Sequence, residues 1–133
     1  MKEQVVNEWV ERANHDLEVA KILFSEEEYF DVVLFHIHQA VEKYIKGFLI
    51  QKGWELKKIH DIETLITEAM NFDTEFQKYV DFGRKITAYY YEERYPPGPV
   101  TPYSREEIEK TLEIVEDIIT RLKKGMKKSK RKI

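Results

Sequence analysis

Hydrophobic residues recur along this chain three and four positions apart, and no segment of useful length alternates as a β-strand would. This spacing predicts five helices and no strands. The predicted helices cover about residues 3–25, 29–52, 62–71, 74–95 and 104–122. Four long helices and one short one predict an all-α fold, an up-and-down antiparallel helical bundle.

Local signals predict where these helices begin and end. Gly53 is a natural left-handed stop for the second helix. Asp61 and Asp73 are placed to cap the third and fourth helices, and Ser104 opens a capping box for the last one. All four prolines lie in residues 96–102, so the fourth helix must end just before this cluster.

The second predicted helix has two faces of different character. With about 100° per residue, its apolar stripe holds Phe30, Val33, Ile37, Val41, Tyr44 and Phe48. The opposite stripe holds His36, Gln39, Lys43 and Lys46, with Ala40 and Gly47 between them. A solvated face usually carries Glu–Lys pairs, so this one is predicted to pack against something or to bind a ligand. Ala40, Gly47 and Gly83 are expected to let the second and fourth helices approach closely.

The net charge of -3 hides an asymmetry along the 133 residues. Residues 121–133 hold eight basic and no acidic side chains, which leaves 14 basic against 25 acidic over residues 1–120, a net of -11. We therefore predict one acidic helical domain over residues 1–125 and a basic, disordered tail over residues 126–133. The acidic body would repel nucleic acid except at a local patch.

Several classes of function are excluded by the composition. The chain has no cysteine, which excludes disulfides, thiolate metal sites and cysteine nucleophiles and fits a reducing cytoplasm. No run approaches the 18 apolar residues of a membrane span. His36 and His38 lie about 200° apart on one helix and cannot chelate the same ion. His38 and Glu42 are expected to form an exposed ion pair. No metal and no cofactor is predicted.

Three local patterns together resemble the HEPN domain family (higher eukaryotes and prokaryotes nucleotide-binding). The first is Phe35-His36-x-x-Gln39-Ala40-x-Glu42-Lys43-x-x-Lys46. The second is Ile59-His60-Asp61-Ile62-x-x-Leu65, and the third is Glu93-Arg94-Tyr95-Pro96. They are similar to family segments on the second helix, at the entry to the short helix and at the end of the fourth helix. The resemblance implies a homodimer and frequent pairing with a minimal nucleotidyltransferase in toxin–antitoxin-like modules.

The chain departs from the ribonucleases of that family in one respect. Those enzymes carry an arginine followed by four to six residues and a histidine on a late helix. The last histidine of this chain is His60, and only two residues separate Arg12 from His15. The spacing is therefore absent, which argues against RNA cleavage by the family's route.

The binding candidates lie on the second and fourth predicted helices and just before the third. His36 is either a partly buried histidine that fixes helix packing or a nucleotide or RNA contact, with Lys43 holding phosphate. His60 either binds an anion at a helix N-terminus or continues the cap. Arg84, Thr87, Tyr91 and Arg94 share one side of the fourth helix, a pattern that suits phosphate binding and base stacking. Arg94 could instead pair with a carboxylate. We predict that His36, Lys43, His60 and Arg94 approach one groove.

Two functions remain open, and no catalytic residue is assigned. The first is an interaction or nucleotide-binding module that pairs with a minimal nucleotidyltransferase, and the missing Arg–His spacing favours it. The alternative is an unconventional or degenerate RNA-cleaving enzyme, a ribonuclease toxin that uses His36, His60 and Arg94.

Overall fold

The computed structural model of the chain describes residues 2–27, 29–94 and 103–131, and the side chains of residues 91–94 and 128–131 lie outside this description. The helices are α1 (Lys2–Ser25), α2 (Phe30–Gln51), α3 (Ile62–Ala69), the 3-10 helix η1 (Thr74–Tyr79), α4 (Val80–Arg94) and α5 (Arg105–Arg131). The described residues contain no strand. The predicted all-α class is confirmed.

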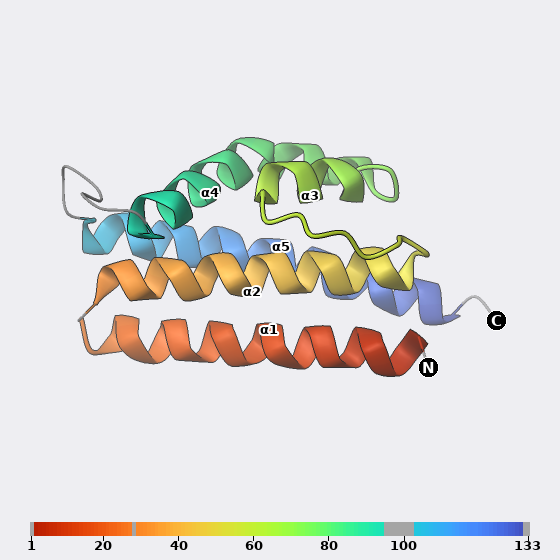
Figure 1. Cartoon of the computed structure of the whole chain (residues 1–133), viewed down its shortest axis with the longest axis horizontal. Coiled ribbons are helices and arrows are strands. Elements are labelled where there is room, and N and C mark those ends of the chain that lie inside the picture. The colour runs from red at the N-terminus through yellow and green to blue at the C-terminus, as the bar shows by residue number, and fades with distance from the viewer. Residues whose placement is uncertain (1, 28, 95–102, 132–133) are drawn as a thin grey trace.

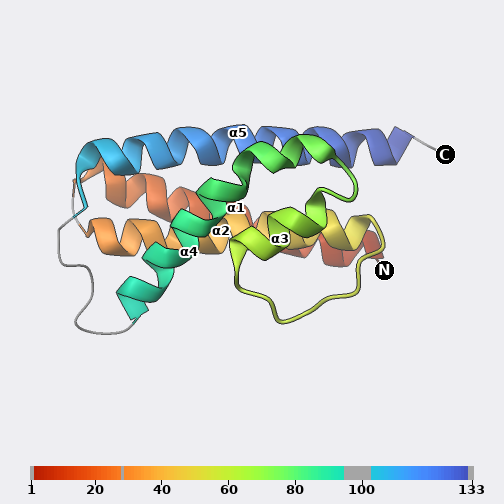
Figure 2. The ribbon, with the colours of Figure 1, turned by 90° about the horizontal axis from the view of Figure 1, so that it is seen from above.

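Helix α2 lies at the centre of the bundle. It runs antiparallel to α1, with α5 beside it and with α3 and α4 across its other side (Figure 1). Seen from above, α4 crosses α2 obliquely, whereas α5 runs along one edge of the molecule (Figure 2). From Val33 to Leu49 every residue is buried except Phe35, His36, Gln39 and Lys43, which are partly exposed. Because almost every side of α2 is covered, its polar side chains have to be matched by partners on neighbouring elements.

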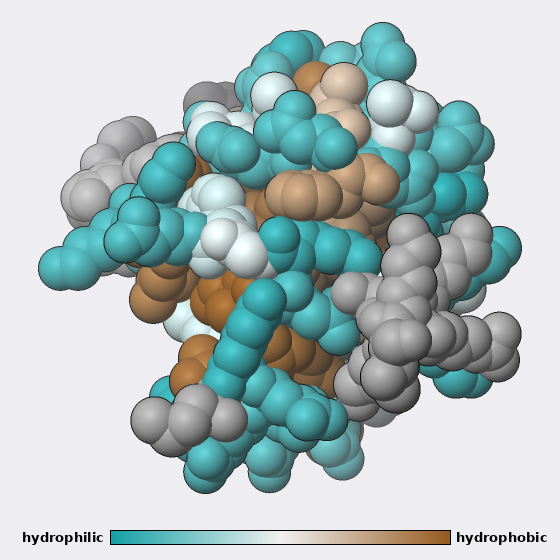
Figure 3. All heavy atoms as spheres, turned by 90° about the vertical axis from the view of Figure 1, so that its right-hand side faces the viewer, coloured by the Kyte–Doolittle hydropathy of each residue, from teal (hydrophilic) through white to brown (hydrophobic). Residues whose placement is uncertain are grey.

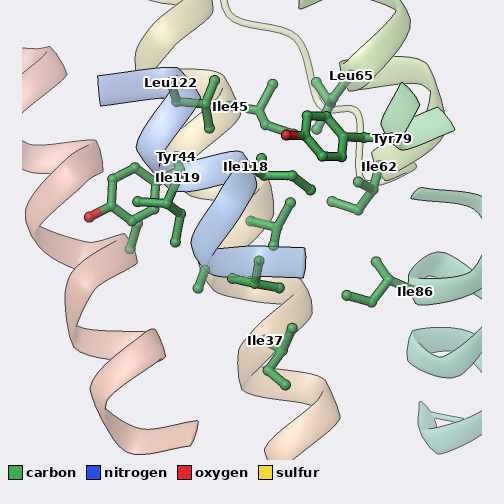
Figure 4. Close-up of a cluster of buried hydrophobic side chains, with 14 of the residues drawn as sticks. Ile37, Tyr44, Ile45, Ile62, Leu65, Tyr79, Ile86, Ile118, Ile119 and Leu122 are labelled. Atoms are coloured by element: carbon green, nitrogen blue, oxygen red, sulfur yellow. The ribbon is translucent and has the colours of Figure 1, made fainter. Parts of the chain in front are cut away.

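The core is a continuous set of apolar side chains from all the helices (Figure 4). Ile37 and Ile45 of α2 lie at its middle, whereas the ring of Tyr44 points toward α1. Two core tyrosines keep their hydroxyl groups bonded. Tyr44 donates to Asn14 of α1, and Tyr79 donates to Asp117 Oδ2 of α5 at 2.5 Å. The apolar stripe predicted for the second helix is thus confirmed as core.

Three of the predicted helix ends are confirmed by their geometry. The Asp61 carboxylate accepts hydrogen bonds from the amides of Glu63 and Thr64 at the start of α3. Gly53, two positions after the last residue of α2, has a backbone φ of 99°, which residues other than glycine rarely adopt. The Ser104 hydroxyl accepts from the amide of Glu107, whose carboxylate accepts from the amide of Ser104.

The fourth helix begins differently from the prediction. Asp73 caps a 3-10 helix, η1, and α4 follows only from Val80. In a 3-10 helix the residues i and i+3 lie on the same side. Phe76 and Tyr79 can therefore both be buried, and they are 1% and 5% exposed.

The last helix is longer than the predicted span of residues 104–122. The backbone of α5 continues through Gly125 to Arg131, and the predicted division of the chain at residue 125 stays a prediction. Two side chains from the end of α2 hold this part of α5, because Lys52 Nζ donates to the carbonyl of Gly125 at 3.1 Å and Gln51 Nε2 to that of Met126 at 3.4 Å. At this end of the molecule hydrophobic side chains show between polar ones (Figure 3).

Gly47 and Gly83 permit close helix contacts other than the predicted contact between the second and fourth helices. A Cβ on Gly47 would lie 3.3 Å from Cβ of Trp9, so Gly47 lets α2 approach α1. A Cβ on Gly83 would lie 2.9 Å from Ile66 and 3.0 Å from the amide nitrogen of Glu63, so Gly83 lets α4 approach α3. None of the described helices is long and apolar enough to cross a membrane.

Gly83 gives a direct test of this packing. We expect Gly83→Ala to lower the free energy of unfolding by about 1–3 kcal/mol, because the added methyl group meets the backbone of α3. Helix propensity alone would favour the alanine by about 1 kcal/mol. Urea denaturation measures the effect, and Ala88→Gly on the exposed side of α4 is the control for propensity. An alanine variant that is more stable than the parent would contradict the close packing of α3 on α4.

Candidate functional site

The polar face of α2 is partly turned toward α1, where one carboxylate serves two of its side chains. Asp16, which is 8% exposed, lies 3.0 Å from Nδ1 of His36 through Oδ1 and 2.5 Å from Nζ of Lys43 through Oδ2. His36 and Lys43 are seven residues apart and so lie on the same side of α2, two turns apart. His36 therefore has the geometry of a partly buried histidine that joins two helices, and Asp16 is a partner that the sequence pattern did not reveal.

A second ionic cluster surrounds Glu42. Its Oε2 accepts from Lys46 Nζ at 2.9 Å, one turn further along α2, and from His60 Nδ1 at 3.0 Å, in the segment that leads to α3. Glu42 and Lys46 are 6% and 3% exposed, so this is a buried ion pair. The ammonium group of Lys46 also lies 5.7 Å from the centre of the Trp9 ring of α1. We name Glu42, Lys46, His60 and His38 the Glu42 cluster.

His38 is the innermost member of the Glu42 cluster. It is fully buried, its ring stacks on Tyr90 of α4 at 4.1 Å, and its Nδ1 lies 3.7 Å from Glu42 Oε1. The expectation of an exposed ion pair between His38 and Glu42 is therefore wrong. Burial lowers the pKa of His38 to about 4, although the charge of Glu42 opposes this shift. His38 is thus neutral at pH 7.

The N-terminus of α3 has no amide left for an anion. The amides of Glu63 and Thr64 donate to the side chain of Asp61, and the amide of Ile62 donates to Thr87 Oγ1 of α4 at 3.0 Å. His60 precedes this cap and is exposed, with its Nδ1 on Glu42. The structure therefore favours the cap over the anion site at this helix end.

The candidates on α4 fall into two groups. Arg84 is exposed and paired with Glu63 Oε2 at 2.8 Å and with Asp81 Oδ1 at 3.2 Å. Its hydrogen bonds to Glu63 raise the pKa of its guanidinium above the ordinary value. The side chains of Tyr91 and Arg94 lie outside the described residues. The predicted groove that His36, Lys43, His60 and Arg94 share therefore stays a prediction, and His36 and His60 contact different carboxylates.

Lys43 also borders a shallow cleft between α1 and α2. The cleft has a volume of about 280 Å³ and is lined by Glu8, Trp9, Arg12 and Lys43. It brings an aromatic ring and two cationic side chains together, the combination that stacks a base and holds a phosphate. The spacing of Trp9 on the first helix indicates only core packing, and Arg12 belongs to none of the candidate motifs. The sequence therefore contains no signal for this cleft.

The Glu42 cluster joins segments that are far apart in the chain. Glu42 comes from the patterned stretch of α2, His60 from the segment before α3, and Tyr90 lies one turn before Arg94 on α4. The first two sequence patterns that resemble the HEPN family therefore meet at one buried carboxylate, and the side chains of the third pattern lie outside the described residues. In the part of the chain that the structure describes, no three histidine, aspartate or glutamate side chains are arranged to hold a metal ion.

Comparison with known proteins decides the family. The family model described as HEPN domain matches residues 6–125. The chain belongs to the HEPN family. It is similar to the protein named "Putative toxin MJ1304" of Methanocaldococcus jannaschii, with 29% identity over 133 aligned positions that cover 90% of this chain and 86% of that protein. It is also similar to TT1696 from Thermus thermophilus, a crystal structure with 25% identity and a TM-score of 0.77, over 90% of this chain and 97% of that one.

The buried ion pair of this HEPN chain predicts strongly non-additive substitutions. Glu42→Gln removes the charge partner of the buried Lys46 and should lower the free energy of unfolding by about 3–5 kcal/mol. The double variant Glu42→Gln with Lys46→Met removes both charges and should lose far less than the sum of the single changes Glu42→Gln and Lys46→Met. Urea denaturation at pH 7 of the two single variants and the double variant measures the coupling. Additive losses would contradict a buried pair.

The lowered pKa of His38 predicts a loss of stability on acidification. The unfolded histidine titrates near 6.5 and the folded one near 4, so the unfolded chain binds more protons between these values. The stability that this histidine contributes is complete above pH 6.5 and falls by up to about 3 kcal/mol as the pH drops to 4. His38→Phe keeps the stacking on Tyr90 and should remove this part of the pH dependence. His15→Gln on the exposed side of α1 should leave it unchanged in urea denaturation between pH 7 and 4.5.

Proposed function

We propose that this chain is the HEPN component of a toxin–antitoxin-like pair in the cytoplasm. In this role it forms a homodimer, associates with a minimal nucleotidyltransferase and binds a nucleotide or RNA without cleaving it by the Arg–His route. Membership of the HEPN family and similarity to a relative named as a toxin support the toxin-like part of the proposal. The sequence contains no arginine with a histidine five to seven positions later, which supports a role without cleavage by that route.

One observation favours an interaction module over a nuclease. The candidate binding side chains that the structure describes are all engaged by carboxylates of the same chain: His36 and Lys43 by Asp16, His60 by Glu42, and Arg84 by Glu63 and Asp81. A scissile phosphate would have to displace these carboxylates, two of which are almost completely buried. Such groups hold helices together better than they stabilise the charge of a phosphoryl transition state.

The cleft between α1 and α2 is the part of the described surface that best suits a nucleotide. The Trp9 ring offers a stacking surface, Arg12 is exposed, and Lys43 keeps a quarter of its side chain accessible while it holds Asp16. We expect Arg12→Ala to weaken nucleotide binding there without unfolding the protein, because Arg12 has no partner among the described residues.

A second function is favoured by the contact between His60 and Glu42. A carboxylate that accepts from Nδ1 of an imidazole leaves Nε2 as the nitrogen that takes up a proton, the arrangement of a general base. His60 is half exposed, with 56% of its side chain accessible, whereas Glu42 is buried behind it. RNA cleavage that depends on His60 is therefore the alternative to a purely binding role.

Co-expression separates the two functions. The chain is produced with a minimal nucleotidyltransferase encoded beside its gene, and each component and the mixture are incubated with RNA. We expect the two proteins to purify together at a fixed stoichiometry and the HEPN chain alone to leave the RNA intact. Cleavage that disappears in His60→Gln but persists in the control His15→Gln would establish the enzymatic alternative. Failure to co-purify with any such partner would contradict the pairing.

A further inference from the structure

The end of α5 is a basic surface on an otherwise acidic protein. Residues 121–133 contain eight lysine or arginine residues and no acidic ones, against a net charge of -11 over residues 1–120. Both ribbon views show the end of α5 projecting past α1 and α2 (Figures 1 and 2). Lys123, Lys124 and Lys127 are exposed on this stretch, and no carboxylate of the described residues lies within ion-pair distance of their ammonium groups. We name these three side chains the α5 lysines.

The helix that carries the α5 lysines is held firmly along its inner side. A Cβ on Gly125 would lie 2.8 Å from Phe48 Cε1, so the glycine lets α5 pack directly on this ring. Arg121, one turn before Lys124, pairs with Asp73 Oδ2 at 2.8 Å. Two side chains at the end of α2 also donate to carbonyls of this stretch, as described above. The lysines are therefore presented on a fixed helix.

The apolar residues of this stretch are turned inward. Leu122 is fully buried, and Met126 packs against the core. From residue 120 to residue 127 the exposed side chains are Thr120 and the α5 lysines. A helix that binds a membrane surface needs an exposed apolar face besides its cations. The outer side of α5 lacks such a face over residues 120–127, so it suits a polyanion in water better than a lipid bilayer.

The spacing of the α5 lysines suits a strand of phosphates. Lys127 is three and four positions from the other two, and residues at these intervals have Cβ atoms about 5–6 Å apart on a helix. Successive phosphates of a nucleic-acid strand follow at a similar interval. Beyond Asp117, which lies more than one turn before Lys123, the sequence contains no acidic residue. The end of α5 is thus a local patch at which the acidic body does not exclude nucleic acid.

An exposed aromatic ring lies beside the same part of α5. Phe72 is 47% exposed, and its ring meets the ring of Phe48 edge-on at 6.3 Å. Because Phe48 packs on Gly125 and the neighbouring Asp73 pairs with Arg121, Phe72 lies next to the stretch that carries the lysines. An exposed ring next to cations can stack on a base, which a single strand offers and a duplex hides.

The start of α1 limits this surface on its other flank. Glu3, Glu8 and Glu11 line a shallow hollow there, at the end of the molecule where α5 also ends. Lys123 lies on the flank toward α1, with its ammonium group 5.9 Å from the centre of the Tyr44 ring. The acidic hollow repels phosphates, so a bound strand is expected to run over the outer side of α5 toward Phe72.

We propose that the end of α5 binds a single-stranded nucleic acid, which in the role proposed above is RNA. The α5 lysines hold successive phosphates, and the ring of Phe72 stacks on a base. This inference rests on the nucleotide or RNA binding of the proposed function. It assigns to RNA a surface separate from the cleft between α1 and α2.

Fluorescence anisotropy of a labelled oligouridine with the full chain tests the proposal. The triple variant Lys123→Gln, Lys124→Gln and Lys127→Gln should raise the dissociation constant about 100-fold at about 0.1 M salt. It should also lower the slope of log Kd against log salt by about 2, because each lost phosphate contact removes about 0.7. Phe72→Ala should raise the dissociation constant about tenfold and leave this slope unchanged, because it removes a stacking surface and no charge.

Two control variants make the same chemical changes elsewhere. Three exposed lysines line a groove between α5 and the elements η1 and α4, and the control Lys78→Gln, Lys85→Gln and Lys110→Gln changes the net charge by the same amount. Ile22→Ala removes an apolar side chain that is 52% exposed on α1. Both controls should bind oligouridine about as tightly as the parent protein. Urea denaturation shows whether each variant is as stable as the parent.

The possible outcomes separate this inference from the proposed function. A parent protein that binds no oligouridine would overturn the inference and leave the pairing and the nucleotide cleft to their own tests. Binding that Arg12→Ala abolishes and the α5 triple variant leaves intact would place RNA at the cleft instead. Equal losses in the two lysine triple variants would trace the attraction to net charge alone. Sedimentation with phosphatidylserine vesicles should show no binding, and vesicle binding without RNA binding would identify a membrane surface.

Discussion

Burial of α2 on nearly all of its sides is the constraint on which the rest of this structure depends. A buried charge is costly unless it is paired, so the charged side chains in the covered part of α2 take partners from their own helix or a neighbouring element, whereas the buried ring of His38 has no hydrogen-bond partner and is neutral. Asp16 of α1 contacts His36 and Lys43, and Glu42 contacts Lys46 of its own helix and His60 of the segment before α3. These contacts fix α1 and the segment before α3 against α2, and apolar packing completes the core around them.

This constraint also explains where the sequence was informative. Helix ends depend on a few neighbouring residues, so the caps at Asp61 and Ser104 and the stop at Gly53 could be predicted from local chemistry. Burial of a polar face depends on what lies opposite it. The stripe of His36 and Lys43 could be recognised as unusual for a solvated face, but Asp16 could be found only once α1 and α2 were placed side by side.

The errors of the sequence interpretation have the same origin. His38 and Glu42 are spaced like an exposed ion pair on a helix surface, and nothing within α2 shows that Tyr90 and the segment before α3 cover them. Similarly, the predicted last helix ended near residue 122, whereas α5 runs on past Gly125, where Lys52 and Gln51 contact its carbonyls. Side chains from distant parts of the chain override the local tendency in each case.

The contacts within the candidate site of this HEPN protein therefore serve first to hold its helices together. Asp16, Glu42 and Glu63 engage the candidate side chains His36, Lys43, His60 and Arg84, while the surface offers a cleft between α1 and α2 lined by Trp9 and Arg12 and a groove beside α5. A protein with this distribution suits association with other molecules better than it suits transition-state stabilisation. Among the described candidates His60, half exposed on a buried carboxylate, has the geometry of a group that could exchange protons with a ligand.

The protonation states of the four histidines test the central role of the buried Glu42 most directly. Nitrogen-15 NMR of the imidazole rings, assigned by single substitutions, reports the tautomer and the titration of each ring. Our account predicts that His60 carries a proton on Nδ1 at pH 7, donated to Glu42, and that His38 stays neutral as the pH is lowered from 8 to 5. A His38 ring that titrates near its ordinary value of 6.5, like an exposed histidine, would contradict the buried Glu42 cluster.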